Sequence, residues 1–461
     1  MSAERAVSAE RAVSADLAVA RKALAAACAE MREGGAADAI GGDGGDGGAA
    51  GVGPAFVAAP ASTDEAAAVL RAAAEHDLAV VPCGGGSRLG WGTPPSRCDV
   101  LVDMTRMDAV VEHAAGDLVA RVQAGARMGD IRAALAGAGQ EIALDVPGGA
   151  TAGGVVASGL AGPRRLRYGS PRDLLIGITI VRADGTVARS GGKVVKNVAG
   201  YDLGKLFAGS AGTLGLITEV TFRLHPLPAA RVFVTAESDS APAAAGAVMA
   251  AANSPLIASA VELNRPSPGG PVGVSVLLEG SADGVAARAQ AMAELLESAK
   301  PISSAELSGA APAWWPGPPA VLAGGGTLVR VSFWVSALGQ VLRAIDAAAR
   351  EAGVSPAVAG SAGAGVLYAR FGAGRAAEMP RSGGEPAPAG AVAGFVGALR
   401  DSLDHGRGGV VVLAAPGAVR EALAARGGMA GRVPGLSLMR AVKDQFDPGN
   451  RMSPGRFPEV I

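Results

Sequence analysis

Three glycine-dense segments are the parts of this 461-residue chain whose residue types and spacing could do chemistry. The first follows the apolar run Val80 to Pro82 and reads CGGGSRLG from Cys83 to Gly90. Consecutive glycines let backbone N–H groups approach an anion and point at one centre, which is what a pyrophosphate needs from a neutral surface. An ordinary glycine-rich turn has the same composition, so both interpretations stay open for this segment taken alone.

Two further segments of the same kind follow along the chain. The second reads PGGATAGGVVASG from Pro147 to Gly159, where Thr151 and Ser158 add hydroxyls that could bind phosphate or ribose. The third reads KNVAGYDL over residues 196–203 and continues as FAGSAGTLGLIT over residues 207–218. Close packing of two elements would also favour such small residues, but three glycine-dense loops in one unit predict an extended ligand lying along backbone.

Competing nucleotide-binding motifs fail on their context. Residues 42–47 match GxGxxG, but no strand precedes them and their two aspartates would repel phosphate. Residues 372–377 follow an expected strand, yet the proline-rich text EMPRSGGEPAPAG stands where a dinucleotide-binding helix should begin. The sequence contains no GxxxxGK[ST] motif, which excludes a P-loop at the level of motifs.

The elements that must position these loops form a mixed α+β unit over residues 54–228. A helix is predicted for Thr63 to His76, where Ser62 and Glu65 supply a capping pattern, and it is followed by the strand Leu78 to Pro82. Further strands are expected near residues 100–102, 118–122, 175–181 and 216–224, with a helix near 128–138. Pro226 and Pro228 mark the boundary of the unit.

Residues 229–440 contain two copies of one pattern of elements. Each copy approximates strand, helix, strand, strand, helix, strand, which is the ferredoxin-like order and predicts an α/β cap domain around an antiparallel sheet. Before the first unit, residues 1–33 are predicted as a helical extension and the Gly/Asp-rich residues 34–53 as a flexible linker. Residues 441–461 form a C-terminal tail.

Composition excludes several classes of protein. With 41 basic and 42 acidic residues the formal charge is −1, so no bulk field favours nucleic acid or an anionic membrane surface as a partner. The three cysteines, Cys28, Cys83 and Cys98, lack CxxC spacing, which argues against disulfides, a metal site or an iron–sulfur cluster within the chain and favours the cytoplasm. No uninterrupted apolar stretch predicts membrane insertion, so at a membrane a partner would hold the protein.

In this order, the three segments resemble the FAD-binding domain of the vanillyl-alcohol-oxidase and para-cresol-methylhydroxylase (PCMH) superfamily. The resemblance covers roughly residues 54–228 and implies a PCMH-type two-subdomain FAD-binding domain followed by the cap. It also implies that the first loop wraps the FAD pyrophosphate, the second flanks the pyrophosphate and isoalloxazine, and the third lies near the adenine or ribose. The cofactor-binding residues so implied are Gly84, Gly85, Gly86, Ser87, Arg88, Leu89, Pro147, Gly148, Gly149, Thr151, Gly153, Gly154, Ser158, Tyr168, Gly215, Ile217 and Arg456.

Within that superfamily the chain looks most like the FAD-binding subunits of bacterial glycolate oxidases. The resemblance rests on Pro163-Arg164-Arg165, Tyr168-Gly169, the KNVAGYDL block and the tail that ends in Ser453 to Phe457. It implies a subunit that joins a larger FAD subunit and an iron–sulfur subunit to oxidise glycolate or D-lactate to the 2-oxo acid. In this family the tail returns to the flavin domain.

Departures from the family pattern concern histidine. Members that bond FAD covalently commonly place His in the first loop, but this chain has Gly84 to Ser87 there, so the FAD is expected to be non-covalent. Larger catalytic relatives carry a GDGNxH-type motif in the cap, whereas here the cap offers only His405, and Ala211 stands where Glu is usual. Oxidation of a 2-hydroxy acid needs a base for the hydroxyl proton, so the missing histidine favours a complex over a self-sufficient enzyme.

No residue is predicted to be catalytic from the sequence. Arg164, Arg165 and Lys196 could hold a substrate carboxylate, with a surface salt bridge as the default role of each. Two alternatives to the complex remain: a self-sufficient FAD-dependent 2-hydroxyacid dehydrogenase, and a non-catalytic assembly subunit that contains flavin. A reductase of cell-wall nucleotide sugars shares the FAD domain, but the KNVAGYDL block and the tail favour the hydroxyacid branch.

Overall fold

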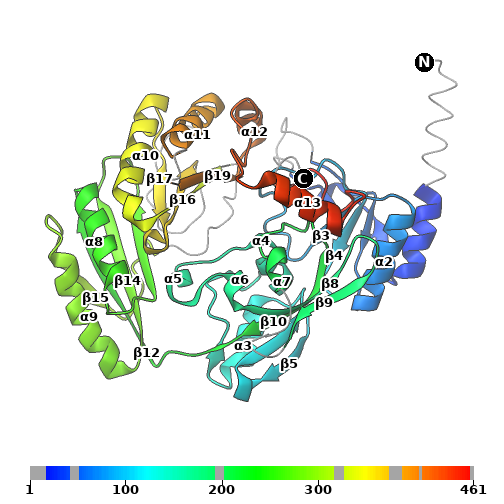
Figure 1. Cartoon of the computed structure of the whole chain (residues 1–461), viewed down its shortest axis with the longest axis horizontal. Helices are drawn as coiled ribbons and strands as arrows, with labels where there is room; N and C mark the ends of the chain where they lie inside the picture. The colour runs from blue at the N-terminus through cyan, green and yellow to red at the C-terminus, as the bar shows by residue number, and fades with distance from the viewer. Residues whose placement is uncertain are drawn as a thin grey trace.

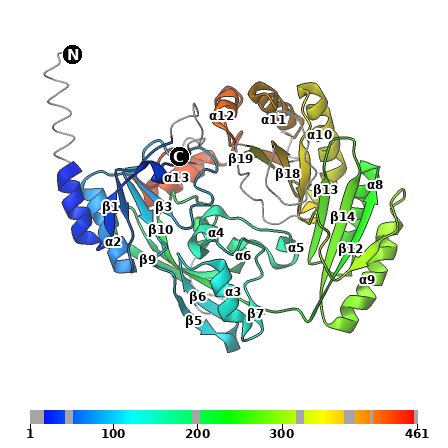
Figure 2. The same cartoon turned by 180° about the vertical axis from the view of Figure 1, so that it is seen from behind.

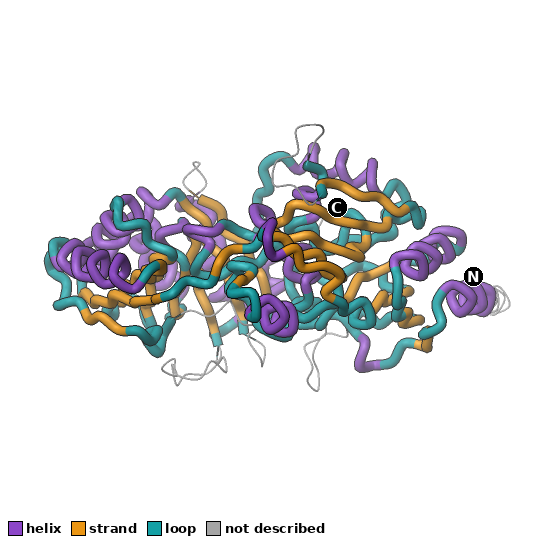
Figure 3. Tube along the Cα trace, turned by 90° about the horizontal axis from the view of Figure 1, so that it is seen from below, coloured by secondary structure: helices purple, strands orange, loops and turns teal. Residues whose placement is uncertain are grey.

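The computed structural model describes residues 17–41, 51–192, 202–315, 326–372, 387–403 and 408–456. These residues form a flavin-domain half and a cap half that lie side by side (Figure 1). Viewed at right angles, the molecule is elongated, with helices at both ends and strands between them (Figure 3). No helix within the described ranges is both long enough and apolar enough to cross a membrane.

The first sheet of the flavin domain has the strand order β1-β2-β4-β3. Its strands are β1 (Met31–Glu33), β2 (Phe56–Ala58), β3 (Val80–Cys83) and β4 (Val100–Asp103). Strands β2, β3 and β4 run parallel, and their apolar side chains pack on α2 (Thr63–Glu75) and on a helix over residues 17–27. The Ser62 hydroxyl caps α2 by accepting from the backbone N–H of Glu65 at 3.1 Å.

The N-terminal region differs from the sequence prediction at two points. Residues 31–33, predicted as part of a helical extension, form strand β1, which pairs antiparallel with β2. Ile40, inside the predicted linker, is only 1% exposed and bridges Val52. The apolar side chains at Met31 and Ile40 have surfaces to bury against, and these tertiary contacts outweigh the local Gly/Asp composition. The most glycine-rich part, residues 42–50, lies outside the described residues.

The second sheet of the flavin domain is antiparallel, with the order β5-β6-β10-β8-β9. The strands are β5 (Val110–Ala114), β6 (Val119–Gln123), β8 (Leu175–Val181), β9 (Val187–Gly191) and β10 (Leu216–Arg223). The helices of this half are α3 (Met128–Ala136), α4 (Ala152–Ser158), α5 (Arg165–Tyr168), α6 (Pro171–Leu174) and α7 (Gly204–Phe207), and a short ribbon joins β7 (Gln140–Glu141) to β11 (His225–Pro226).

The cap is one eight-stranded sheet with the order β15-β12-β14-β13-β17-β18-β16-β19. The strands are β12 (Ala230–Ser238), β13 (Ala260–Arg265), β14 (Val272–Gly280), β15 (Glu306–Ser308), β16 (Thr327–Phe333), β17 (Ala357–Gly360), β18 (Val366–Phe371) and β19 (Gly408–Ala414). Numbered within its own unit, each half has the order 4-1-3-2, and β13 pairs with β17 where the halves meet. Two ferredoxin-like units are therefore joined edge to edge, as the element pattern predicts.

Helices cover one face of the cap sheet. They are α8 (Ala241–Asn253), α9 (Ala282–Glu297), α10 (Leu338–Ala352) and α11 (Ala389–Leu403), which lie on the outer side in Figures 1 and 2. On β16, Val329 and Val331 point into the helix-covered core, whereas Leu328 packs with Tyr368 and Trp91 on the other face. Side chains alternate along a strand, so Leu328 projects from the face that the helices leave uncovered, and its contact with Trp91 places that face against the flavin domain.

The end of the chain packs against the flavin domain. After α12 (Gly417–Ala424) and α13 (Leu436–Phe446), the backbone runs along β3, where Val80 N–H donates to Arg451 O and Ser453 N–H donates to Val80 O, both at 2.8 Å. The Lys443 ammonium donates to the Thr213 carbonyl at 2.8 Å. The last described residues are thus held beside the first glycine loop.

Candidate functional site

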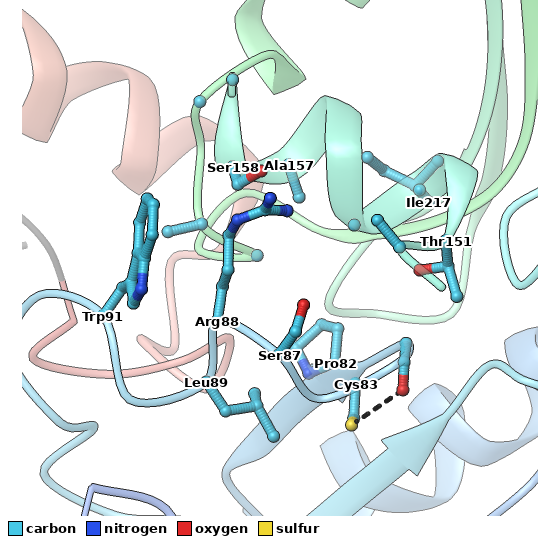
Figure 4. Close-up of a pocket in the computed structure, with 18 of the residues that line it drawn as sticks. Pro82, Cys83, Ser87, Arg88, Leu89, Trp91, Thr151, Ala157, Ser158 and Ile217 are labelled. Carbon is cyan, nitrogen blue, oxygen red and sulfur yellow. Dashed lines mark hydrogen bonds between the residues drawn. The ribbon is translucent and has the colours of Figure 1, made fainter. Parts of the chain in front are cut away.

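A cavity of about 400 Å³ lies between the flavin domain and the cap. One wall comes from the loop after β3, another from α4 and residues 208–217, and the cap contributes Arg330, Val412 and Leu413. Figure 4 shows Arg88 in the middle of this space, between Ser158 and Trp91. Of the residues predicted to bind the cofactor, the structure places these in the cavity wall: Gly84, Gly85, Gly86, Ser87, Arg88, Leu89, Thr151, Gly153, Gly154, Ser158, Gly215, Ile217 and Arg456.

The first two glycine loops touch each other beside the cavity. A Cβ on Gly84 would lie 2.1 Å from Thr151 Oγ1, and a Cβ on Gly85 would lie 2.9 Å from the Gly149 carbonyl oxygen. Gly86 has φ +70°, which favours glycine. The contact between the loops therefore requires glycine at positions 84 and 85. These glycines permit close packing of the two loops and also line the cavity that could hold a ligand.

Three backbone donors of the first loop have no protein acceptor within the described residues. Within the described part of the chain, the N–H groups of Gly84, Gly85 and Ser87 donate to no protein acceptor. Unpaired N–H groups next to a cavity can bind an anion that accepts several hydrogen bonds. The Cys83 thiol adds no charge there, because burial raises its pKa to about 11.

Arg456 holds the first loop in place from the C-terminal tail. Its Nη2 atom donates to the carbonyl oxygens of Arg88 at 3.0 Å and Leu89 at 2.8 Å. Burial lowers the pKa of Arg456 to about 10, which still leaves the guanidinium charged at neutral pH. The tail thus supplies both a positive charge and a clamp on the loop.

Several predicted site residues lie elsewhere. Pro147, Gly148 and Gly149 are outside the cavity wall, although Gly149 contacts Gly85. The KNVAGYDL block, including Lys196, falls largely on residues 193–201, which lie outside the described residues. Tyr168 is at the domain boundary, where its hydroxyl donates to Glu279 at 3.1 Å and its ring meets His225 edge to face.

The Arg164 guanidinium belongs to a buried ion-pair network. Its guanidinium donates to both Glu141 oxygens at 2.7 and 3.0 Å and to Asp145 at 2.7 Å, and it lies 3.6 Å from Glu279 of β14. Burial opposes the charged form, but Glu141 and Asp145 outweigh it and hold the pKa of Arg164 above its ordinary value. Arg164 therefore forms ion pairs with acids of both the flavin domain and the cap. Its salt bridges are buried, so the predicted surface location is wrong.

Arg165 lies on the cap side of the flavin domain and is not part of the cavity wall. Its Nε donates to the Gly162 carbonyl at 3.1 Å and its Nη2 to the Tyr368 hydroxyl at 3.4 Å. Sequence reasoning missed Arg330, which reaches the cavity from β16. Its signal in the sequence is a charged residue inside the apolar run TLVRVSF, which only the packing of the cap distinguishes from a solvent-facing position.

The chemistry of the cavity wall fits an anionic dinucleotide. Its charged residues within the described ranges are Arg88, Arg172, Arg330 and Arg456, with no carboxylate and no histidine among them. The Nε atoms of Arg88, Arg330 and Arg456 are buried without a protein hydrogen-bond partner. Buried donors and free backbone N–H groups match the two phosphates of FAD, whose negative charges would offset the guanidinium groups. No group of three potential metal ligands occurs in the described part of the structure.

Comparisons with known proteins find two similar domains in this chain. Residues 54–191 match the family model described as FAD binding domain, and residues 429–457 match that described as FAD linked oxidases, C-terminal domain. The glycolate oxidase subunit GlcD of Bacillus subtilis is 36% identical over 46% of this chain and 46% of its own length. The glycolate oxidase subunit GlcE of Escherichia coli is 43% identical over 33% of this chain and 44% of its own length. The chain thus spans less than half the length of these curated relatives.

The fold is also found among solved structures. That of p-cresol methylhydroxylase superposes with a TM-score of 0.70 over 97% of each chain, with 15% of residues identical. The protein therefore has the fold of the PCMH-type flavoproteins, as the glycine segments predict. It carries an FAD-binding domain and a C-terminal segment of the FAD-linked oxidases, and its cofactor is FAD.

Proposed function

We propose that this chain is the FAD-binding subunit of a glycolate oxidase-like complex, which oxidises a small 2-hydroxy acid to the 2-oxo acid. The observation that carries the proposal is the cavity itself. It lies between the glycine loops and the cap, it is lined by guanidinium groups, and none of its described lining residues is a histidine or a carboxylate. The named functions of GlcD and GlcE support the reaction class and the assembly.

In the proposed reaction, this chain's residues mainly bind and orient. The N–H groups of Gly84, Gly85 and Ser87 hold the pyrophosphate of a non-covalent FAD, and Thr151 and Ser158 supply hydroxyls along the second loop. Bound FAD supplies the acceptor for the two electrons and the hydrogen removed from the substrate carbon. Trp91 and Leu413 place apolar surface at the cavity wall, which limits the access of water.

Removal of the hydroxyl proton is the step that this site does not explain. A general base must lie within hydrogen-bond reach of that proton, and no histidine or carboxylate stands among the described residues of the cavity wall. We therefore assign the base to a partner subunit. The partners proposed are a larger FAD subunit and an iron–sulfur subunit, which would accept the electrons.

The proposal is tested with the full chain purified alone and with its co-purifying partners. The isolated chain is expected to be yellow and to release FAD on denaturation, which shows non-covalent binding. Addition of glycolate or D-lactate without oxygen should bleach the flavin only in the complex. A colourless chain that takes up no FAD would overturn the proposal.

Two alternative functions predict different results in the same experiment. Turnover of glycolate or D-lactate by the isolated chain would establish a self-sufficient dehydrogenase instead. For a non-catalytic assembly subunit, the complex would keep full turnover when this chain's FAD is lost through substitution at Gly84. Measuring flavin content beside turnover separates the three functions.

A further inference from the structure

Two arginines gather around the hydroxyl of Tyr368 on the uncovered face of the cap sheet. Tyr368 on β18 is paired directly opposite Arg330 on β16, so both side chains project from the same face. Arg165 reaches this face from α5 and donates to the Tyr368 hydroxyl at 3.4 Å. Arg330 also lines the cavity, as does Arg88 of the first glycine loop.

Arg330 lacks the acidic partner that the buried arginines Arg164 and Arg265 have, and it shares this lack with Arg88 and Arg456 of the same cavity wall. Arg164 is paired with Glu141 and Asp145, and Arg265 of β13 is paired with Asp346 at 2.7 and 3.1 Å. Among the described residues, no hydrogen bond or ion pair joins the Arg330 side chain to another group, and its Nε is buried. Burial without a counter-charge lowers its pKa. An unpaired buried cation is costly, so a site that retains one is suited to an anionic ligand.

The nearby acid does not neutralise this cluster. Glu262 of β13 is fully buried and interacts with Arg165, but burial raises the pKa of its carboxyl to about 8, so it is largely protonated at neutral pH. The cluster of Arg330, Arg165 and Tyr368 therefore keeps a positive charge at the cap end of the cavity.

We propose that Arg330 binds the carboxylate of the 2-hydroxy acid, with Tyr368 and Arg165 positioning it. This inference rests on the proposed function and assigns the substrate end of the same cavity. The planar guanidinium can donate two parallel hydrogen bonds to a carboxylate, which orients a small acid with its hydroxyl-bearing carbon turned toward the glycine loops. The cap neighbours Val412 and Leu413 are apolar and leave Arg330 as the polar anchor of that wall.

A role for Arg330 in holding the pyrophosphate is less consistent with its position. The free backbone N–H groups and the Arg456 clamp belong to the loop after β3, in the flavin domain. Arg330 belongs to a cap strand and lines the same cavity from the cap side. The two anion sites are thus carried by separate domains.

The test uses the FAD-loaded full chain and oxalate, a carboxylate that flavin does not oxidise, with binding measured by calorimetry and by the change in flavin absorbance. Loss of a charge-assisted bidentate contact should weaken oxalate binding about 10- to 100-fold in R330Q, with a smaller loss in R330K because the charge is kept. R343Q, which removes an arginine of α10 outside the cavity wall, is the matched control and should bind oxalate like the parent chain. Without oxalate, R330Q should unfold at a higher denaturant concentration than the parent, because an unpaired buried charge is removed.

Each other outcome overturns the inference. Oxalate affinity that is unchanged in R330Q, or absent in the parent chain, excludes a carboxylate site at Arg330. Loss of FAD from R330Q with normal folding would make Arg330 a ligand of the cofactor instead. Failure of the proposed function gives a different result from failure of this inference. In that case oxalate binding would still depend on Arg330, but no 2-hydroxy acid would reduce the flavin of the chain or of its complex.

Discussion

The Lys443 ammonium and the Asp447 carboxylate form a buried ion pair of 2.6 Å, one turn apart at the end of α13. Lys443 also donates to the carbonyl oxygens of Thr213 and Met452, and Asp447 accepts from the N–H of Met452 at 2.6 Å. The pair therefore joins the tail to the third glycine segment. Through the tail it also positions Arg456, which clamps the first loop.

Replacing Lys443 by Met should destabilise the chain by about 3–5 kcal/mol, because the Asp447 carboxylate would stay buried without its cation. FAD should also dissociate more readily, since the Arg456 clamp depends on the same tail. Chemical denaturation and flavin release measure the two effects. The double variant K443M/D447N should recover part of the lost stability, and equal losses in single and double variants would contradict the coupling.

Replacing Gly84 by Ala should abolish or strongly weaken FAD binding, because the added Cβ would lie 2.1 Å from Thr151 Oγ1. Gly90→Ala is the matched control, since a Cβ there meets nothing within 4 Å. Flavin content after purification reports the difference. Adding Thr151→Ala to Gly84→Ala should restore binding only in part, because the Thr151 Cβ remains 3.1 Å away. Full FAD content in Gly84→Ala alone would show that the two loops can separate without cost.

Replacing Arg164 by Ala should cost about 3–5 kcal/mol of unfolding free energy, because Glu141 and Glu279 would remain buried without this cation. Arg164→Lys should be intermediate, since one ammonium cannot donate to both Glu141 oxygens in the same bidentate geometry. Thermal and urea unfolding measure the effect. Normal stability together with lost affinity for oxalate would make Arg164 a substrate ligand after all.

The buried Glu262 carboxyl should make the free energy of unfolding fall as pH rises. Burial raises the pKa of this carboxyl from 4.5 to about 8, with Ser361 and Arg165 opposing the change and Asp145 adding to it. Between these two values the folded state binds more protons than the unfolded state, so the free energy of unfolding falls as pH rises. Glu262→Gln should remove this contribution and stabilise the chain at pH 8 by a few kcal/mol, because each tenfold change in proton affinity is worth about 1.4 kcal/mol.

The Glu262 prediction is checked by unfolding the parent chain and Glu262→Gln at pH 5 and at pH 8. The variant is expected to gain stability over the parent mainly at the higher pH. An identical loss of stability in both proteins between the two pH values would assign the dependence to other groups.

Much of the fold could be predicted because its signals are local. The Ser62 cap, the apolar strand before Cys83 and the repeated ferredoxin-like order each depend on neighbouring residues, and the structure contains all three. Prediction failed for β1, because its three residues pair with residues 56–58, which are distant in the sequence, on a sheet that also packs against the helix over residues 17–27. Pairing between distant segments leaves little trace in a single sequence.

For the candidate site, too, some features follow from the sequence and others only from the tertiary structure. The sequence by itself determined which loops can approach a pyrophosphate, because only glycine permits the contact of Gly84 with Thr151 and the positive φ of Gly86. Which arginines keep a free charge was decided by the tertiary structure. Arg164 pairs with Glu141 and Asp145, whereas the Arg330 side chain, on the uncovered face of the cap, forms no ion pair among the described residues. Charge pairing depends on which side chains the packing of two domains brings together, and composition does not contain that information.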